Sequence, residues 1–429
     1  MITLIIHIIQ PGDTIYKIAQ QFGISADKII ADNGIEDATK LMIGQSLVID
    51  NDIIKYTIQK GDTIFNIAKA HGVSINDIMD ANPGITNPNL IYTGQIINIP
   101  INLKKLGTID VGGYAFPQTS LQVLSNILPC LTYLPIFSYQ VQEDGRLNQL
   151  YETDVLNAAI QQRVMPKMTI TNIRADEGFD SDLAHNVLVD PIAQNRLIEN
   201  IINIFNTTPY KSLNIDFEYI YQNDREAFNQ FLRNIVTILH PLGYTVSTAL
   251  APKVHSDQQG ILYEAHQYEE QGKIVDQIWI MTYEWGYTYG PPMAVSPIDQ
   301  VERVLKYAVS VIPSTKIMMG LPNYAYDWTL PFVKGNRATS MSLLSAINLA
   351  VRMKVNIQFD DVSQTPFFEY TDPSGQNHIV WFDDARSIDA KLRLVKKYNL
   401  AGIFYWNVNT YFPANWVVLR SLYNINKII

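Results

Sequence analysis

Apolar and polar positions follow the same pattern twice within the first hundred residues. The segment 7–19 recurs 49 residues later as 56–68, and the correspondence continues to the end of each copy. In each copy, an alternating run predicts a strand, apolar residues three or four positions apart predict two short helices, and a second alternating run predicts a closing strand. We therefore expect two modules with a β-α-α-β fold, residues 1–50 and 53–101.

Beyond residue 100 the repeat disappears, and short β-rich runs alternate with helical segments, which is typical of βα units. Eight such runs can be counted, at 108–116, 133–139, 168–173, 213–219, 245–250, 277–283, 316–321 and 402–406. Eight strands with helices between them predict a closed (β/α)8 barrel of the α/β class over residues 104–429. Active residues are expected at the C-terminal ends of its strands.

The gap between the seventh and eighth runs is longer than one helix requires. It contains the β-rich segments 367–370 and 378–382 on either side of a Pro-Ser-Gly turn at 373–375, a pattern that predicts a hairpin. We therefore expect an inserted α+β flap at about 325–385 that forms one wall of the active-site cleft.

The charge and residue counts exclude several classes of ligand. The chain has 32 Lys and Arg residues against 41 Asp and Glu residues, a formal net charge of −9, so a nucleic acid is not an expected partner. The single cysteine, Cys130, lies in an apolar stretch and is predicted to be a buried small side chain rather than a nucleophile. The seven histidines lack the spacing of a metal site, so we expect no metal and no other cofactor.

The apolar start of the chain, residues 1–9, lacks a positively charged region and a cleavage site, and it is too short to span a membrane. We expect it to form the first strand of a domain, without a signal peptide. No other run reaches spanning length, so a membrane is not an expected partner.

The fourth β-rich run alternates polar and apolar residues, and two of the polar residues are acidic. Because alternate residues of a strand face the same way, Asn214, Asp216 and Glu218 are predicted to point to one side and the odd-numbered residues of 213–219 to the other. An isolated Asp-x-Glu is more often the solvent-facing side of an ordinary strand. Here the motif lies on the fourth strand of a barrel, where two adjacent buried acids raise the pKa of one of them and so favour a general acid.

The repeated segments resemble the LysM family in three signals that occur in both copies: Gly-Asp-Thr after the first strand, Asn after the second helix and Gly-Gln before the last strand. The resemblance implies binding of glycans that contain N-acetylglucosamine, in peptidoglycan or chitin. The candidate binding residues are Gly12, Asp13, Thr14 and Ile43 in the first copy and Gly61, Asp62, Thr63 and Tyr92 in the second. A purely local role for the Asp and Thr residues, in a turn and as a helix cap, is an equal alternative.

The run around Glu218 resembles the fourth-strand signature of glycoside hydrolase family 18, Asp-Gly-x-Asp-x-Asp-x-Glu. Its last two acids correspond to Asp216 and Glu218, whereas Lys211, Ser212 and Asn214 occupy the three earlier positions. The resemblance implies that Glu218 is the catalytic acid and that Asp216 is its partner. The loss of the inner acid leaves open how Asp216 is held, although Asn214 can still donate a hydrogen bond to it.

Further motifs extend this resemblance over residues 104–429. Residues 280–284 resemble the sixth-strand motif Met-x-Tyr-Asp/Glu, which implies that Tyr283 is a catalytic residue that hydrogen-bonds the acetamide of the substrate. Residues 402–406 resemble the eighth strand, which implies that Trp406 forms the floor of the sugar subsite. We also expect a role in substrate binding for Asn214, Glu284 and Tyr114.

The resemblance also implies a retaining, substrate-assisted mechanism, in which the acetamide of the substrate replaces an enzyme nucleophile. Tandem LysM repeats followed by this barrel resemble the spore cortex-lytic glycosidases. This implies a peptidoglycan hydrolase, an N-acetylglucosaminidase that acts on spore cortex fragments during germination. We expect it in the cortex and coat region of the spore, and we expect a monomer. Two alternatives stay open, namely a chitinase and a non-catalytic, lectin-like barrel, the latter disfavoured by the presence of both carboxyl groups.

Overall fold

The structure of the protein is a computed structural model. It describes residues 4–51, 53–100, 105–175 and 177–429. The predicted start of the first strand at Met1 and the predicted domain boundaries at 101 and 104 lie outside these ranges. Within them, every helix is too short or too polar to cross a membrane.

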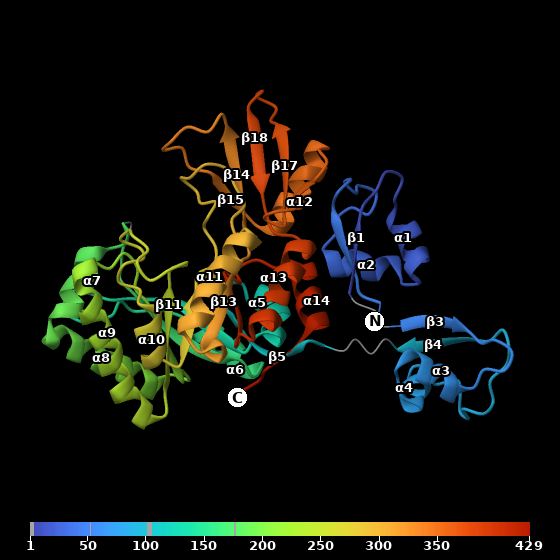
Figure 1. Cartoon of the computed structure of the whole chain (residues 1–429), viewed down its shortest axis with the longest axis horizontal. Helices are drawn as coiled ribbons and strands as arrows, with labels where there is room; N and C mark the ends of the chain where they lie inside the picture. The colour runs from blue at the N-terminus through green and yellow to red at the C-terminus, as the bar shows by residue number, and fades with distance from the viewer. Residues whose placement is uncertain (1–3, 52, 101–104, 176) are drawn as a thin grey trace. The chain divides into compact units, whose positions relative to one another are not determined.

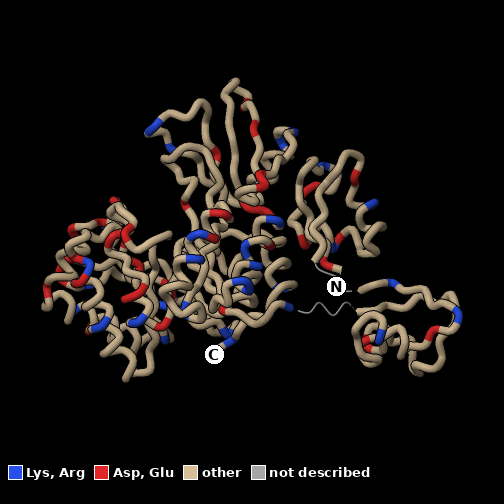
Figure 2. Tube along the Cα trace, viewed as in Figure 1, with Lys and Arg blue, Asp and Glu red and all other residues tan. Residues whose placement is uncertain are grey.

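The chain divides into two compact units (Figure 1). One contains Met1–Leu106 and Phe412–Tyr423, and the other contains Gly107–Tyr411 and Asn424–Ile429. Acidic and basic residues are interspersed along the trace of both units (Figure 2). Positive and negative residues are therefore mixed along the described chain and are not separated into segments of one sign.

Each N-terminal repeat has the predicted β-α-α-β order. The elements of the first are β1 (Ile5–Ile8), α1 (Ile15–Phe22), α2 (Ala26–Asn33) and β2 (Ser46–Ile49). Those of the second are β3 (Ile53–Thr57), α3 (Ile64–His71), α4 (Ile75–Asp80) and β4 (Ile96–Pro100). The two strands of each repeat pair antiparallel, and the apolar residues at helical spacing, such as Ile64 and Ile67, are buried in a small core.

One asparagine in each repeat joins the end of the second helix to the last strand. Asn33 donates from Nδ2 to the main-chain oxygens of Ile29 and Val48, both at 2.9 Å, and its Oδ1 accepts from the Val48 N–H at 2.7 Å. Asn82 makes the corresponding three bonds in the second repeat, at 2.7, 2.6 and 2.8 Å. In each repeat, one of these bonds goes to a helix carbonyl and two go to the N–H and carbonyl of one residue in the last strand, so the asparagine ties the helix end to that strand.

The eight predicted barrel strands are all present. They are β5 (Gly107–Gly113), β6 (Tyr133–Gln140), β7 (Met165–Thr171), β10 (Ser212–Asp216), β11 (Thr245–Leu250), β12 (Gln277–Ile280), β13 (Ile317–Pro322) and β19 (Gly402–Trp406). Each pairs in parallel with the next, and β19 pairs with β5 to close the ring. The prediction of a (β/α)8 barrel is confirmed.

Helices alternate with these strands. They are α5 (Leu121–Ile127), α6 (Thr153–Gln161), α7 (Ser181–Val189), α8 (Pro191–Thr207), α9 (Arg225–Leu239), α10 (Tyr268–Ile274), α11 (Ile298–Val311), α13 (Ala385–Tyr398) and α14 (Pro413–Leu422). A short hairpin of β8 (Ile173–Arg174) and β9 (Gly178–Phe179) follows β7, and β20 (Tyr423–Ile425) lies beside β5. Cys130 is fully buried, as predicted.

Aromatic side chains fill the barrel interior. Trp279 packs on Phe404 with ring centroids 4.8 Å apart, and the ring of Tyr114 lies edge-on to both. Gly112 makes room for this cluster, because a Cβ atom at that position would lie 2.3 Å from the Trp279 ring. The barrel is thus a packed core that supports the site above it.

The predicted insertion between the seventh and eighth barrel strands forms a sheet of its own. Its elements are β14 (Ala325–Leu330), β15 (Thr339–Met341), α12 (Leu343–Met353), β16 (Gln358–Asp360), β17 (Thr365–Thr371) and β18 (Asn377–Trp381). The strand order is β15-β14-β18-β17-β16, and all neighbours are antiparallel. The strands β17 and β18 are the predicted hairpin. Figure 1 shows this insertion as a lobe that projects from the barrel.

We expect Asn82→Ala to destabilise the second repeat by about 2 kcal/mol, because the substitution leaves main-chain groups of α4 and β4 without partners. Amide hydrogen exchange of the full chain should show this as faster exchange in residues 53–100. Asn66→Ala, at an exposed asparagine of the same repeat, is the control and should leave the exchange unchanged. Equal protection in wild type and Asn82→Ala would contradict the proposed role of Asn82.

Candidate active site

The candidate catalytic residues lie where β10 ends. Leu213 is fully buried, and Phe217 stacks on Phe231 of α9 with ring centroids 5.8 Å apart. Because these apolar residues pack outward against the helices, the alternate residues Asn214 and Asp216 face the barrel interior. The predicted division of this strand into a polar and an apolar side is therefore correct up to Phe217.

Asp216 and Glu218 both line a pocket of about 540 Å³ at the C-terminal ends of the barrel strands. Asp216 is 4% exposed, and Glu218 is half-buried. The aromatic residues of the pocket wall are Phe137, Phe179, Tyr219, Tyr263, Tyr283, Tyr287, Tyr326 and Trp406. An apolar wall with a few polar groups is the usual form of a small-molecule binding site.

The predicted alternation is wrong for Tyr219. The strand was expected to extend over 213–219, but it ends at Asp216, the last residue that pairs with β7. Tyr219 has a φ of 54°, in the left-handed region, so its side chain does not continue the alternation of the strand. It is 40% exposed and contributes to the pocket wall.

The hydrogen bond expected from Asn214 to Asp216 is also absent among the described residues. Asn214 instead donates from Nδ2 to the Tyr114 hydroxyl at 2.8 Å and accepts from the Ser247 hydroxyl at 2.9 Å. Asn214 and Tyr114 are at most 1% exposed and do not belong to the pocket wall. Both residues are therefore buried outside the pocket wall, and a role for them in substrate binding stays a prediction.

One oxygen of Asp216 has no hydrogen-bond partner in the part of the chain that the structure describes. Its Oδ1 is buried, and no described residue donates a hydrogen bond to it. A buried carboxylate oxygen without a partner is energetically unfavourable. The carboxyl group of Asp216 also lines the pocket, so a bound ligand can contact it.

Glu284 is a third carboxyl group in the pocket wall. Its Oε1 accepts hydrogen bonds from the hydroxyls of Tyr324 and Tyr326, the latter at 2.8 Å. Tyr326 belongs to β14 of the insertion, and Tyr324 immediately precedes that strand. The insertion therefore forms one wall of the site and fixes the position of Glu284.

Burial and mutual repulsion raise the pKa values of these acids. Burial raises the pKa of Asp216 above its usual range. Burial raises the pKa of Glu218 well above its ordinary value, and the negative charges of Asp216 and Glu284 raise it further. Burial also raises the pKa of Glu284, which the two tyrosine hydrogen bonds partly oppose. Glu218 is therefore the group best suited to carry a proton near neutral pH.

Tyr283 and Trp406 both reach the pocket, as predicted. Tyr283 follows β12, is 8% exposed, and has a pKa raised well above its usual value by burial, so its hydroxyl stays protonated and can donate a hydrogen bond. Trp406 is the last residue of β19 and packs against Phe137, with ring centroids 4.7 Å apart. Its ring therefore forms part of a stable aromatic surface in the pocket.

Several residues of the pocket wall were not predicted from the sequence, among them Tyr263, Tyr287 and Tyr326. Each lies after a barrel strand or in the insertion, and no motif marks it. The available signal was their position, because the segments after barrel strands meet at one end of the ring. Among the described residues, no group of three or more His, Cys, Asp or Glu side chains is arranged to hold a metal ion.

The Asp and Thr residues of the two Gly-Asp-Thr motifs have local structural partners. Asp13 accepts hydrogen bonds from the Gln10 N–H and the His7 ring, and Thr14 caps α1. Asp62 accepts from the Gln59 N–H and the Tyr56 hydroxyl, and Thr63 caps α3. The alternative of turn and cap chemistry accounts for all four side chains. Gly12 and Gly61 have φ values of 88° and 96°, which the same turn requires.

The two remaining LysM candidates are available for binding. Ile43 is 38% exposed and Tyr92 is 69% exposed. Both lie in the loop before the last strand of their repeat. An exposed aromatic ring is a suitable surface for a ligand, so Tyr92 is the stronger of the two candidates.

Comparison with known proteins places the chain in a family. Residues 178–410 match the Glycosyl hydrolases family 18 model, and residues 7–50 and 56–100 match the LysM domain. Over 427 residues the chain is 40% identical to a cortical fragment-lytic enzyme of Bacillus anthracis, with 98% of each chain covered. It is also 40% identical over 430 residues to a cortical fragment-lytic enzyme of Bacillus subtilis, covering 98% of this chain and 99% of that one.

Solved structures show the same relationship. The spore cortex-lytic enzyme SleL of Bacillus megaterium superimposes with a TM-score of 0.88 at 37% identity, with 99% of each chain covered. A chitinase of Chromobacterium violaceum, at 22% identity, shares the fold with a TM-score of 0.69, over 73% of this chain and 98% of that one. With its acids, tyrosines and tryptophan at the ends of the barrel strands, the chain belongs to glycosyl hydrolases family 18 and carries two LysM domains before its barrel.

Proposed function

We propose that the protein is an N-acetylglucosaminidase that degrades spore cortex peptidoglycan fragments, with Glu218 as its catalytic acid. The observation that carries the proposal is that Glu218, whose pKa burial raises well above its ordinary value, and Asp216 line one aromatic pocket. An N-acetylated sugar supplies both a glycosidic oxygen for the acid and an amide N–H for the carboxylate.

In the first step, Glu218 gives its proton to the glycosidic oxygen, and the bond from that oxygen to the anomeric carbon breaks. The acetamide oxygen of the same sugar attacks the anomeric carbon and forms a cyclic oxazolinium ion. This substrate-assisted reaction is one of the recognised exceptions to the scheme with two catalytic carboxylates. In the second step, Glu218 takes a proton from a water molecule that opens the ring, so the anomeric configuration is retained.

Asp216 and Tyr283 hold the acetamide during this reaction. The carboxyl group of Asp216, which lines the pocket, accepts from the acetamide N–H and stabilises the positive charge that develops on the oxazolinium ion. Tyr283 donates a hydrogen bond from its hydroxyl to the acetamide from the opposite side. Trp406 supports the sugar ring. Holding the acetamide in the correct orientation lowers the activation free energy, and such orientation can contribute several kcal/mol to a reaction within one molecule.

The choice of cortex peptidoglycan rests on the relatives. The cortical fragment-lytic enzymes of two Bacillus species and the SleL structure match this chain over nearly its whole length at 37 to 40% identity. Both LysM domains and the barrel are included in that match. We therefore place the protein in the cortex and coat region of the spore during germination, acting as a monomer, with its repeats bound to the glycan strands.

We expect Glu218→Gln to lower kcat at least about 100-fold, because the amide keeps the shape of the side chain but cannot donate a proton as an acid. Mass spectrometry of purified spore cortex fragments should show products with reducing-end N-acetylglucosamine for the wild type and not for the variant. Glu226→Gln, at an exposed glutamate of α9, is the matched control and should keep full activity.

The other outcomes of this experiment identify the alternatives. Release of sugars from chitin oligomers but not from cortex would make the protein a chitinase. Binding of cortex without any release by the wild type would make it a glycan-binding protein. Full activity of Glu218→Gln would contradict the assignment of the acid.

We expect Glu284→Gln to move the alkaline limb of the pH profile of kcat/KM to lower pH. The negative charge of Glu284 raises the pKa of Glu218, so its removal makes Glu218 lose its proton at a lower pH. Gln keeps an oxygen for the hydrogen bonds from Tyr324 and Tyr326. The same profile for Glu226→Gln serves as the control, and an unmoved limb in Glu284→Gln would show that the two acids are not coupled.

We expect Tyr92→Ala to weaken cosedimentation of the full chain with insoluble cortex peptidoglycan severalfold, because it removes an exposed ring of the second repeat. Thermal unfolding should be unchanged, since the side chain is 69% exposed. Tyr151→Ala, at a tyrosine 79% exposed outside the repeats, is the control. If both variants bind as the wild type does, Tyr92 is not part of the binding surface.

A further inference from the structure

The main chain around Glu218 lies outside the barrel ladder. The strand β10 ends at Asp216, whose partner on β7 is Thr171, and residues 217–221 form neither strand nor helix. Main-chain groups of a partly buried segment need other hydrogen-bond partners. Those partners also help to determine where the carboxyl group of Glu218 lies, because the side chain starts from the main chain that they hold in place.

Asn172 supplies these partners for Glu218 itself. Its Oδ1 accepts from the Glu218 N–H at 3.0 Å, and its Nδ2 donates to the Glu218 carbonyl oxygen at 2.8 Å. One side-chain amide thus holds the peptide groups on both sides of the acid. Asn172 is fully buried and is not part of the pocket wall, so it does not contact the substrate.

Asn172 is in turn fixed at the start of α7. Its Nδ2 also donates to the Asp180 carbonyl oxygen at 2.9 Å, and its own carbonyl oxygen accepts from the Asp180 N–H at 2.9 Å. Asp180 is the N-cap of α7, where its side chain accepts from the Leu183 N–H. The side-chain amide of Asn172 is therefore anchored on both sides and cannot turn without breaking three hydrogen bonds.

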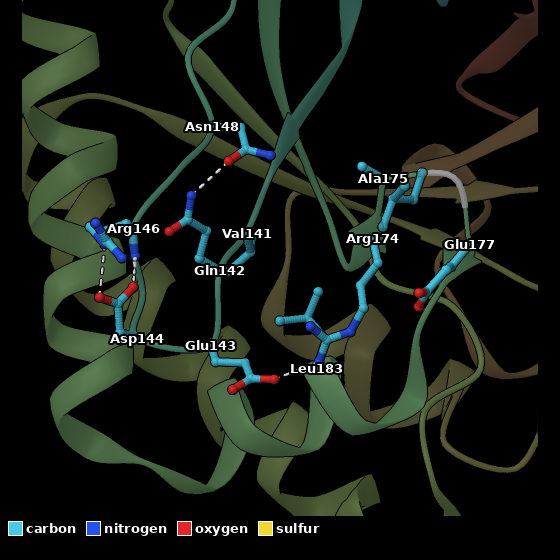
Figure 3. A pocket seen from close by; sticks show the side chains of 11 residues that line it. Val141, Gln142, Glu143, Asp144, Arg146, Asn148, Arg174, Ala175, Glu177 and Leu183 are labelled. Atoms are coloured by element: carbon cyan, nitrogen blue, oxygen red, sulfur yellow. Dashed lines mark hydrogen bonds and ion pairs between the residues drawn. The ribbon is translucent and has the colours of Figure 1, made fainter.

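A series of ionic contacts extends this anchor outward. Asp180 Oδ2 accepts from Arg174 Nε at 2.9 Å, and Arg174 Nη2 contacts Glu143 at 2.5 Å. Figure 3 shows Arg174 and Glu143 in the wall of a second pocket, beside Leu183. The first residues of α7 also hold the segment after the acid, because the Ser181 hydroxyl donates to the Tyr219 carbonyl oxygen at 2.5 Å.

We propose that Asn172 is the positioning residue of the catalytic acid: its side-chain amide, locked between Asp180 and both peptide groups of Glu218, sets the position from which Glu218 delivers its proton. The proposal rests on the assignment of Glu218 as the acid, but it holds for any N-acetylated substrate. Only a carboxamide of this length offers an acceptor and two donors at this point. Displacement of a catalytic group by about 1 Å can cost about 100-fold in rate.

The test compares Asn172→Ala and Asn172→Asp with the wild type in the full chain, with cortex fragments as substrate. We expect Asn172→Ala to lower kcat about 100-fold and to change KM less than about threefold, because the pocket wall is intact. Asn229→Ala is the matched control. Asn229 is also fully buried, and its side chain bonds to Glu226, Gln267 and Gln271, not to the catalytic segment. This variant should lose stability and keep the kcat of the folded enzyme.

The variant Asn172→Asp provides a second readout, the pH dependence of kcat, which does not depend on a loss of stability. An ionised carboxylate can accept from the Glu218 N–H but cannot donate to its carbonyl oxygen, whereas a protonated carboxyl group can donate to it. We therefore expect the ratio of the kcat of Asn172→Asp to that of the wild type to rise as the pH falls. This variant also carries the test if Asn172→Ala does not fold.

Three outcomes would overturn the proposal: a kcat of Asn172→Ala within about threefold of the wild type, an equal loss of kcat in Asn229→Ala, or a ratio for Asn172→Asp that is independent of pH. Full activity of Glu218→Gln is a separate result. It would overturn the assignment of the acid, whatever the behaviour of the Asn172 variants.

Discussion

The burial of Asp216 and Glu218 at the open end of a closed barrel is the constraint on which the rest of the site depends. Two carboxyl groups in a poorly solvated pocket cannot both be ionised without a large cost in free energy. The protein does not relieve this cost with a buried lysine or arginine in the pocket wall. Burial and the neighbouring negative charges instead raise the pKa of Glu218, and no described residue donates to the Oδ1 of Asp216.

The closed ring brings the contributors to this site together. Asp216 ends β10, Tyr283 follows β12 and Trp406 ends β19, so residues nearly two hundred positions apart meet at one end of the barrel. The packed aromatic interior below them, with Tyr114 against Trp279 and Phe404, keeps the strand ends at fixed positions. The apolar core therefore holds the catalytic residues in position, although it does not itself take part in the reaction.

Much of this arrangement could be predicted from the sequence, because period-two alternation and the ordering of strands are local signals. The two repeats, the eight strands, the hairpin of the insertion and the pair Asp216 and Glu218 were all found in this way. Contacts between residues that are far apart in the sequence give no such local signal. Asn172 and Glu218 are 46 positions apart, and Tyr326 and Glu284 are 42 apart. The left-handed conformation of Tyr219 was missed because a strand pattern does not show where its ladder ends.

The contact of Tyr324 and Tyr326 with Glu284 gives the insertion a role in the chemistry. The lobe has its own sheet and helix, and through Glu284 it acts on the pKa of Glu218. Two enzymes with identical catalytic residues and different lobes would therefore work best at different pH values. In this chain, the lobe between the seventh and eighth strands is thus a part whose exchange is expected to change the working pH without altering a catalytic residue.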